Sequence, residues 1–194
     1  AVVAMGVALF HLCRFAASKA YLEVASVEDP EGGEVWYYLA LHAMREGNMP
    51  LAETFFQRAN ELEQDRWLKP VFLSLEAVEK LVIEMLEQFP QEIRKVIKDI
   101  PVIIEDFPPE ELLHSTEPPL DPLLLGLFEG VPLPEQSVFD APQDVNRVTV
   151  FAANIALIAA DQQKLVEELF ITLKHEIGHF LGLDEDDLTA RGLD

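Results

Sequence analysis

The sequence predicts an α+β fold, in which an all-helical N-terminal part precedes a domain of helices and short strands. Three kinds of pattern lead to this prediction: apolar residues at helical spacing, short apolar runs of strand composition, and one long amphipathic helix close to the end. In order, these are helices within 34–65, a helix at 73–89, a helix at 91–100, strands at 101–109 and 146–152, and a helix from about 162 to 181. The helical pattern breaks around 65–70, so we expect a helical segment at 1–68 and a second domain at 72–194.

The helices of residues 34–65 carry small and aromatic residues at regular offsets, namely Trp36, Leu39, Ala40, Ala43, Ala52, Phe56 and Ala59. Through these residues the segment resembles a tetratricopeptide repeat, a helix-turn-helix unit. Gln64 stands where the repeat has its final proline, whereas Pro30 and Ala25 match the pattern thirty-four residues earlier. Residues 1–30 would then be a degraded earlier repeat, although no clear turn divides them. The segment is either a helical hairpin that caps its neighbour or a groove that binds a protein partner.

The opening ten residues are apolar, but they do not predict a membrane span or a secretion signal. Basic side chains at Arg14 and Lys19 interrupt the run well before the ~20 residues that cross a bilayer, and no basic segment precedes it. We therefore expect a buried helix here. The one cysteine, Cys13, is expected to be a small buried hydrophobe, and its lack of a partner favours a cytoplasmic location.

The charge balance excludes two classes of partner. The chain has 35 acidic and 14 Lys plus Arg residues, for a net charge of −21. Such a surface repels phosphate groups, so we expect neither nucleic-acid binding nor binding to a membrane surface.

A long connection lies between the two predicted strands. Residues 108–146 are rich in proline, glycine and acids, and "LLLGLF" at 123–128 is their one apolar stretch. We expect this connection to be irregular and to help shape a site.

The last predicted helix carries two histidines on the side away from its apolar face. Its apolar residues fall within an arc of about 160°, and His175 and His179 lie outside that arc. Histidines at i and i+4 are one turn apart and can both reach one ion at about 2.1 Å. Glu176 is turned away by about 100°, where a general base that takes a proton from water would stand. This His-Glu-x-x-His pattern is typical of zinc hydrolases.

The residues after the helix offer a third ligand. Gly182 falls where the helix must end, and glycine readily takes the left-handed turn that reverses the chain. Glu185 is the favoured third ligand, with Asp184 as the alternative and His114 as a candidate from before the helix. We expect Asp186 and Asp187 to be solvated at the start of a last short helix.

Residues 75–194 are similar to the bacterial minimal zincin-like family of zinc metallopeptidases. "PVIIEDFPPEELL", "LLGLFEGVPLPEQS" and "HEIGHFLGLDEDDL" carry the resemblance. It implies a short sheet beside the His-Glu helix, Zn²⁺ held by both histidines and an acidic residue three after the glycine, and a peptide or protein substrate. That acidic residue is usually aspartate in the family, and here it is Glu185. The resemblance also places Gly126, Gly130 and Pro132 at a cleft wall.

Three hypotheses follow for the chain. In the first it is a zinc-dependent peptidase with Glu176 as general base, and Arg147 or Arg191 is a candidate donor to the oxyanion. In the second it is a tetratricopeptide-type binding protein whose zinc domain is structural or silent. In the third the motif binds no metal. Two histidines, one acid and no nearby cysteine favour an open coordination position, and therefore the first hypothesis.

Overall fold

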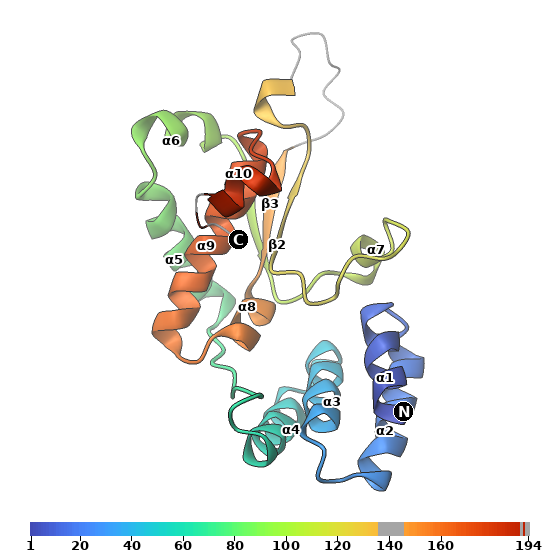
Figure 1. Cartoon of the computed structure of the whole chain (residues 1–194). Helices are drawn as coiled ribbons and strands as arrows, with labels where there is room; N and C mark the ends of the chain where they lie inside the picture. The colour runs from blue at the N-terminus through green and yellow to red at the C-terminus, as the bar shows by residue number, and fades with distance from the viewer. Residues whose placement is uncertain (136–145, 191, 193–194) are drawn as a thin grey trace. The chain divides into compact units, whose positions relative to one another are not determined.

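The computed structural model describes residues 1–135, 146–190 and 192 (Figure 1). The chain divides into two compact units, and each is built from two stretches of sequence. One unit comprises 1–70 and 107–123, and the other comprises 71–106 and 124–194. We call them the helical unit and the sheet unit. The chain therefore crosses from the sheet unit into the helical unit and back before it completes its sheet.

The described helices of the helical unit are α1 (Val2–His11), α2 (Phe15–Glu28), α3 (Gly33–Arg45), α4 (Met49–Leu62) and the short α7 (Glu110–Leu113). Helix α1 packs against α2, and α3 packs against α4, so the first four helices form two consecutive hairpins (Figure 1). The small residues expected where the helices cross, such as Ala25, Ala40 and Ala52, are buried. These hairpins agree with the expected helical architecture, and the tetratricopeptide assignment itself stays a prediction.

The sequence shows no turn within residues 1–30, yet the structure places one at Leu12–Arg14. The turn depends on Cys13, which has a left-handed φ of 56° although it is not a glycine. Its buried thiol donates to the carbonyl oxygen of Leu120 at 3.5 Å. The expected burial of Cys13 is confirmed. The turn was not predicted, because it is supported by a contact with a residue far along the chain rather than by a local sequence pattern. Helix α1 is not the buried helix that was expected, since only Gly6 and Phe10 are buried within it.

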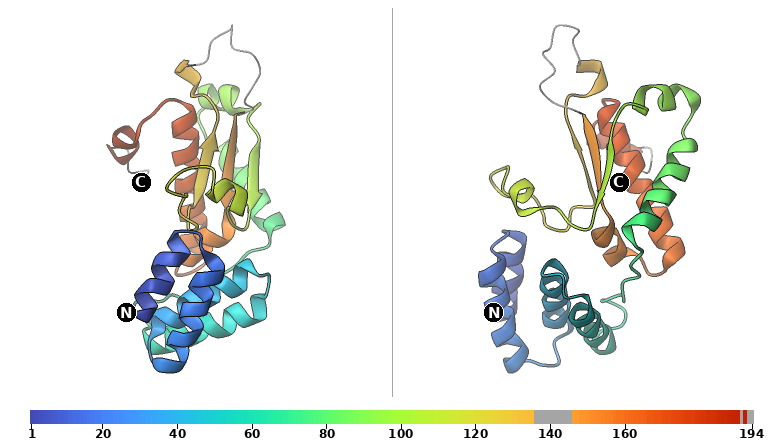
Figure 2. Two further views of the ribbon diagram at one scale, coloured as in Figure 1. Left: turned by 90° about the vertical axis from the view of Figure 1, so that its right-hand side faces the viewer. Right: turned by 180° about the vertical axis from the view of Figure 1, so that it is seen from behind.

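The described elements of the sheet unit are α5 (Leu75–Glu87), α6 (Gln91–Ile97), β1 (Val102–Glu105), β2 (Gly126–Glu129), the 3₁₀ turn η1 (Leu133–Glu135), β3 (Arg147–Phe151), α8 (Ala152–Ile158), α9 (Gln162–Phe180) and α10 (Glu185–Ala190). The three strands lie in the order β1-β3-β2, with β3 parallel to β1 and antiparallel to β2. Helix α9 packs against β2 and β3, and α5 packs beside α9 (Figure 2). This mixed architecture confirms the α+β prediction.

Strand β2 corrects the expectation of an irregular connection. Gly126–Glu129 pairs with β3 in a register that places Gly126 opposite Val150 and Glu129 opposite Arg147. The strand was missed because four residues that begin with glycine carry little strand signal. Its pairing comes from β3, which is buried from Val148 to Phe151 and forms the centre of the sheet.

Helix α8 was also missed, because it follows β3 without a break. The run from Arg147 to Ile158 is mostly apolar, and a continuous apolar run does not separate a buried strand from a buried helix. Strand β1 covers only residues 102–105, in the first half of the expected 101–109 run. Beyond it, Phe107 to Pro109 belong to the helical unit, where Pro108 is buried.

The core of the sheet unit lies between α9, α5 and one face of the sheet. Its buried members are Val78, Val82, Met85, Ile97, Val148, Val150, Ile155, Leu169, Leu173, Ile177 and Phe180. Burying a side chain of this kind contributes about 1.5–3 kcal/mol each. This core therefore fixes α9 against β2 and β3 and leaves its other side for chemistry.

Candidate metal centre

Helix α9 is positioned by its cap and by its apolar face. Asp161 accepts a hydrogen bond from the backbone N–H of Lys164 at 2.8 Å, which is the N-cap that the sequence predicts. Leu169, Leu173 and Ile177 are buried in the core. The side chains of His175 and His179, on the other side, are 23% and 27% exposed. Both imidazoles are thus half-buried and reachable from outside, as expected for ligands rather than core residues.

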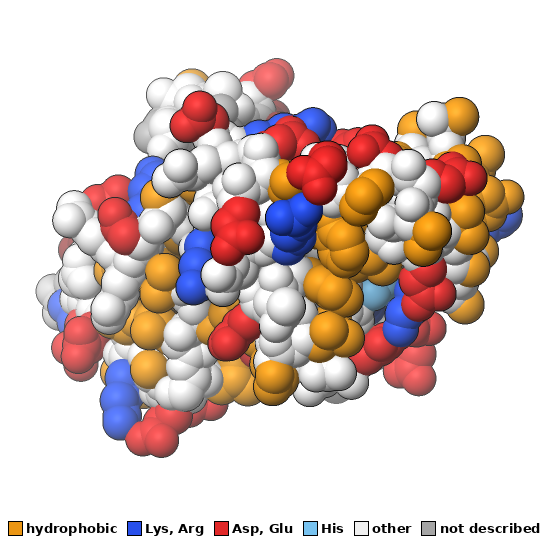
Figure 3. Space-filling view, turned by 90° about the horizontal axis from the view of Figure 1, so that it is seen from below, with side chains coloured by type: hydrophobic (Ala, Val, Ile, Leu, Met, Phe, Trp, Pro, Cys, Tyr) orange, Lys and Arg blue, Asp and Glu red, His pale blue; other side chains and the backbone are white. Residues whose placement is uncertain are grey.

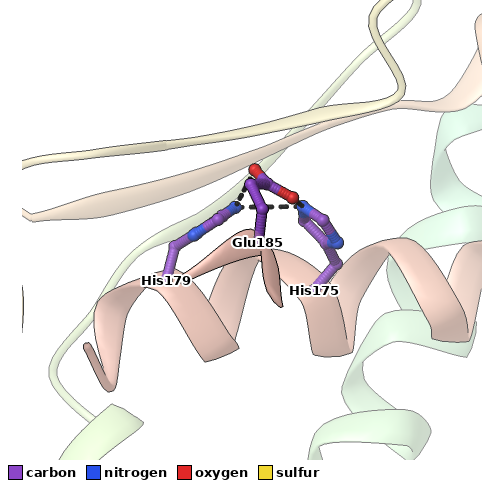
Figure 4. A group of neighbouring side chains, drawn as sticks. All are labelled: His175, His179 and Glu185. Atoms are coloured by element: carbon purple, nitrogen blue, oxygen red, sulfur yellow. Dashed lines mark hydrogen bonds and ion pairs between the residues drawn. The ribbon is translucent and has the colours of Figure 1, made fainter. Parts of the chain in front are cut away.

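The two histidines converge with a glutamate from the next helix (Figure 4). The Nε2 atoms of His175 and His179 are 3.0 Å apart. Oε1 of Glu185 is 3.2 Å from Nε2 of His179, and Oε2 of Glu185 is 3.8 Å from Nε2 of His175. Among the described residues, this is the group of histidine, cysteine and acidic side chains whose geometry suits a metal ion.

The turn after α9 brings Glu185 back to the histidines. Gly182 has φ 86°, and its N–H donates to the carbonyl of His179. The N–H of Leu183 donates to the carbonyl of Gly178, which completes a Schellman motif. The expected glycine turn is therefore present at Gly182. A Cβ at this position would also lie 2.6 Å from Pro134, so a side chain is excluded on two grounds.

The same turn orients one imidazole. Nδ1 of His179 lies 3.2 Å from the carbonyl oxygen of Leu183. Because a carbonyl only accepts, the bond requires the proton on Nδ1 and leaves Nε2 with its lone pair toward the cluster. Such an outer hydrogen bond holds a histidine in the tautomer that binds metal.

Helix α10 sets the position of Glu185. The N–H of Asp187 donates to Oδ1 of Asp184 at 2.9 Å, so Asp184 caps α10 and Glu185 follows it with its carboxylate at the histidines. Leu188 is fully buried against α9, where a Cβ on Gly178 would lie only 2.5 Å from it. The glycine within the motif thus allows α10 to approach. Asp186 and Asp187 are exposed in its first turn.

Glu176 follows His175 on α9 and is buried. Its Oε2 accepts a hydrogen bond from the backbone N–H of Phe128 in β2 at 2.7 Å. Burial raises the pKa of the Glu176 carboxyl, while the charges of His175 and His179 and the Phe128 bond act in the opposite direction. A Cβ on Gly126 would lie 2.8 Å from Cγ of Glu176, so the glycine lets β2 pass directly over this carboxyl.

A cleft of about 540 Å³ opens over these groups. It is lined by β2, by the turn around Pro132 and by the two histidines, with Glu176 and Glu185 among its polar groups. Gly126, Gly130 and Pro132, which were expected at a cleft wall, all line it.

Three other residues were candidates from the sequence: Arg147 and Arg191 as donors to the oxyanion, and His114 as a ligand. The guanidinium of Arg147 donates two hydrogen bonds to the Glu129 carboxylate, at 2.6 and 2.8 Å. It therefore forms an ion pair between β3 and β2. His114 belongs to the helical unit, and its Nδ1 lies 2.8 Å from the carbonyl of Glu110. Arg191 lies outside the described residues.

The donor set fits zinc. Ligands at about 2.0–2.1 Å in a tetrahedron stand about 3.3 Å from one another, and the closest ligand atoms here are 3.0 and 3.2 Å apart. Two imidazole nitrogens and one carboxylate are the protein ligands of many catalytic zinc sites, in which the fourth position stays open.

A comparison with protein-family models supports the same assignment. Residues 97–193, half of the chain, match the model of the zincin-like metallopeptidases. The chain belongs to the zincin-like metallopeptidase family. The matched region contains the three strands, α9 and the side chains of His175, His179 and Glu185. No protein with a curated description matches the sequence. None of the described helices is long and apolar enough to cross a membrane.

Sequence reasoning missed the backbone groups that orient this family's motif here. The Phe128 N–H and the Leu183 carbonyl carry no side-chain signal. The role of the Leu183 carbonyl could have been predicted, because a Schellman turn at Gly182 fixes the backbone conformation of the residues that follow the helix. The Phe128 N–H could not, since it depends on a strand that was not predicted.

Alanine at Gly126 is expected to lower the free energy of unfolding by about 1–3 kcal/mol, because its methyl group overpacks against Glu176 and Thr172. Urea unfolding followed by circular dichroism measures the change. Gly32→Ala is the matched control, since the nearest atom to its Cβ is a terminal oxygen of Asp29 at 3.2 Å. Equal stability of the two variants would show that β2 does not press on α9.

Proposed function

We propose that this chain is a zinc-dependent metallopeptidase that hydrolyses peptide bonds with Glu176 as general base. The observation that carries the proposal is the convergence of His175, His179 and Glu185 at a cleft that the buried Glu176 also lines. Membership of the zincin-like metallopeptidases supports the reaction class and a peptide substrate.

In this proposal Nε2 of His175, Nε2 of His179 and the Glu185 carboxylate hold the zinc ion. When bound, zinc supplies a Lewis acid that polarises a carbonyl and makes water a better nucleophile. The Leu183 carbonyl keeps the proton of His179 on Nδ1, so that Nε2 stays available. The carboxylate of Glu185 is exposed and would bind the ion from α10 rather than from the buried core.

Glu176 has the position for proton transfer. The Phe128 N–H holds Oε2, which fixes the carboxyl plane and leaves Oε1 to take a proton from water and deliver it to the leaving amine. Burial of the carboxyl raises its pKa, which favours a base that can both accept and release a proton. The cleft lining brings both histidines and Glu176 to one space, where a peptide can enter.

A second candidate function is protein binding by the helical unit. Its support is apolar surface on α1 and α2, where Met5, Tyr21, Val24 and Val27 are 45% to 83% exposed. Figure 3 shows hydrophobic side chains gathered over these helices at the right of the view. We propose a tetratricopeptide-type module here, which either recruits substrate to the peptidase or is the main function beside a silent zinc domain.

The cellular setting belongs to the same proposal. A single cysteine and no disulfide framework support a cytoplasmic location. The resemblance to the minimal zincins supports a bacterial source. The net charge of −21 supports the absence of nucleic-acid and membrane partners.

The peptidase function is tested by metal removal. Protein purified without chelator is expected to cleave members of a peptide library, to lose cleavage on treatment with 1,10-phenanthroline, and to regain it when one equivalent of zinc is added. Mass spectrometry of the products measures cleavage, and elemental analysis measures zinc. Cleavage that persists in metal-free protein would contradict the mechanism. Zinc-loaded protein that cleaves no peptide would favour the binding module.

A further inference from the structure

A second hollow lies beside the metal cleft, within the sheet unit. Its volume is about 200 Å³, and it shares Leu124, Gly126, His175 and Glu176 with the lining of the cleft. An engineered cavity of about 150 Å³ in another protein holds benzene, so a hollow of this size can hold one amino-acid side chain. Because it borders a proposed zinc ligand and the proposed base, that side chain would belong to a residue next to the bond that is cut. We call this hollow the side pocket.

The side pocket extends back along α9 from the metal cluster. The other members of its lining are Leu125 and three residues of α9, namely Glu168, Ile171 and Thr172. Glu168 stands seven residues before His175, which is about 10 Å along a helix. The pocket therefore combines apolar walls of leucine and isoleucine with a carboxylate at the end that is away from the metal.

Thr172 brings an unpartnered hydroxyl to the side pocket. The residue is only 6% exposed, and its Cγ2 is the atom that faces Gly126, where a Cβ would lie 2.8 Å from it. Among the described residues none forms a hydrogen bond with Oγ1 of Thr172, yet this oxygen is not completely enclosed by protein atoms. Because Thr172 lines the side pocket, its hydroxyl is available to a polar group that enters there. A buried hydroxyl gains free energy when such a partner arrives.

Glu168 supplies a negative charge one turn further along α9. Its side chain is 19% exposed, and Nζ of Lys164 donates to its Oε1 at 2.8 Å. A carboxylate has two acceptor oxygens, so Oε2 of Glu168 can still accept a hydrogen bond from a ligand. The described residues that line the side pocket and the cleft include acids but neither lysine nor arginine. The charge of this lining therefore favours a cationic side chain in the substrate.

From these groups we propose that the side pocket binds the side chain of an arginine next to the scissile bond, and that Glu168 determines this specificity. The inference rests on the peptidase function proposed above. The apolar stem of the arginine packs against the leucine walls, its Nε–H donates to Thr172, and its terminal N–H groups donate to Oε2 of Glu168. Thr172 and Glu168 are four residues apart and thus neighbours on one helix face, so one planar guanidinium can reach both. Lysine has no donor along its stem and would leave the Thr172 hydroxyl without a partner.

Cleavage of three peptides by the zinc-loaded protein tests the proposal. The peptides differ only at the residue next to the cleaved bond, which is arginine, lysine or citrulline, the uncharged analogue of arginine with nearly the same shape. Wild-type kcat/KM is expected to be about tenfold higher for arginine than for citrulline, because hydrogen bonds between charged groups are the stronger ones, and the ratio should fall as salt is added. Glu168→Gln is expected to remove most of this preference and to leave the rate on the citrulline peptide unchanged. Thr172→Val keeps the shape of the side chain and is expected to remove the advantage of arginine over lysine.

Two further variants of α9 bracket the result. Lys164→Ala removes the cation that competes for Glu168, so the preference for arginine is expected to rise. Glu167→Gln makes the same chemical change one residue along the helix, at a side chain that is 50% exposed and lines neither hollow, so it is expected to keep the wild-type preference. The proposal is overturned if the wild type cleaves the arginine and citrulline peptides equally well, or if Glu168→Gln keeps the wild-type ratio.

Peptide binding separates this inference from the peptidase proposal. Fluorescence anisotropy of the same labelled peptides with zinc-loaded Glu176→Gln measures affinity without cleavage. The arginine peptide is expected to bind about tenfold more tightly than the citrulline peptide, and addition of Glu168→Gln should abolish the difference. A wild-type protein that cleaves nothing would reject the peptidase, and the ratio of the two affinities would then decide for or against the side pocket.

Discussion

Alanine in place of His175 or His179 is expected to abolish stoichiometric zinc binding. In the proposed site each histidine would supply one of three ligand atoms, and loss of one would leave only two ligands for the ion. Changes to groups that only orient a ligand cost about 10–100-fold in metal affinity, so loss of a ligand itself should cost more than about a hundredfold. Elemental analysis of protein purified without chelator is expected to find about one zinc per chain in the wild type and close to none in either variant.

His114→Ala is the control for these variants. His114 is exposed, belongs to the helical unit and was the alternative ligand from before the motif helix. Its removal is expected to leave the zinc content unchanged. A His179→Ala protein that keeps its zinc would show that the ion sits elsewhere, and it would end both the peptidase and the structural-zinc hypotheses as written.

Glu185→Ala and Asp184→Asn distinguish the two candidates for the third ligand. Glu185→Ala is expected to weaken zinc binding, since its carboxylate lies 3.2 Å from Nε2 of His179. Asp184→Asn is expected to change little, because asparagine serves as an N-cap about as well as aspartate. Competition with a zinc-binding dye measures both affinities. A larger loss in Asp184→Asn would reverse the assignment.

The sequence predicts the parts of the site that lie close together along the chain. His175, Glu176 and His179 share one helix, so helical periodicity alone relates their directions. Glu185 comes after a turn that the glycine at 182 predicts, and in the structure Gly182 has the expected left-handed φ. In each case the residues are close together in the chain, so a short sequence pattern is enough to predict how they lie relative to one another.

The parts that were missed depend on partners far away in the chain. Strand β2 was predicted to be irregular because its pairing comes from β3. The hydrogen bond from the Phe128 N–H to Glu176, forty-eight residues away in the chain, was missed for the same reason. The turn at Cys13 depends on Leu120, and the packing of residues 107–123 on the N-terminal helices depends on Arg45 and His11. None of these has a local signal, because the side chains involved are ordinary ones and only tertiary packing selects them.

The change with the largest expected effect on chemistry is Glu176→Gln. Glutamine has nearly the same shape, and its carbonyl oxygen can accept the Phe128 N–H in place of Oε2, so the fold and the zinc content are expected to persist. An amide nitrogen cannot take a proton from water, so cleavage should fall by roughly a hundred- to ten-thousand-fold. Initial rates on a peptide that the wild type cleaves, at matched zinc content, measure the effect.

Glu167→Gln makes the same chemical change on the same helix and serves as its control. Glu167 is exposed, bonds Gln163 and lies away from the cleft lining, so the rate should stay within about twofold of wild type, as for surface substitutions of small effect. If Glu176→Gln retained the wild-type rate, the base would have to be another group, and Glu185 is then the nearest carboxylate. If it lost zinc as well as activity, Glu176 would support the ligands rather than the proton transfer. Retained zinc with lost cleavage is the pattern expected of a general base, because it separates holding the metal from moving the proton.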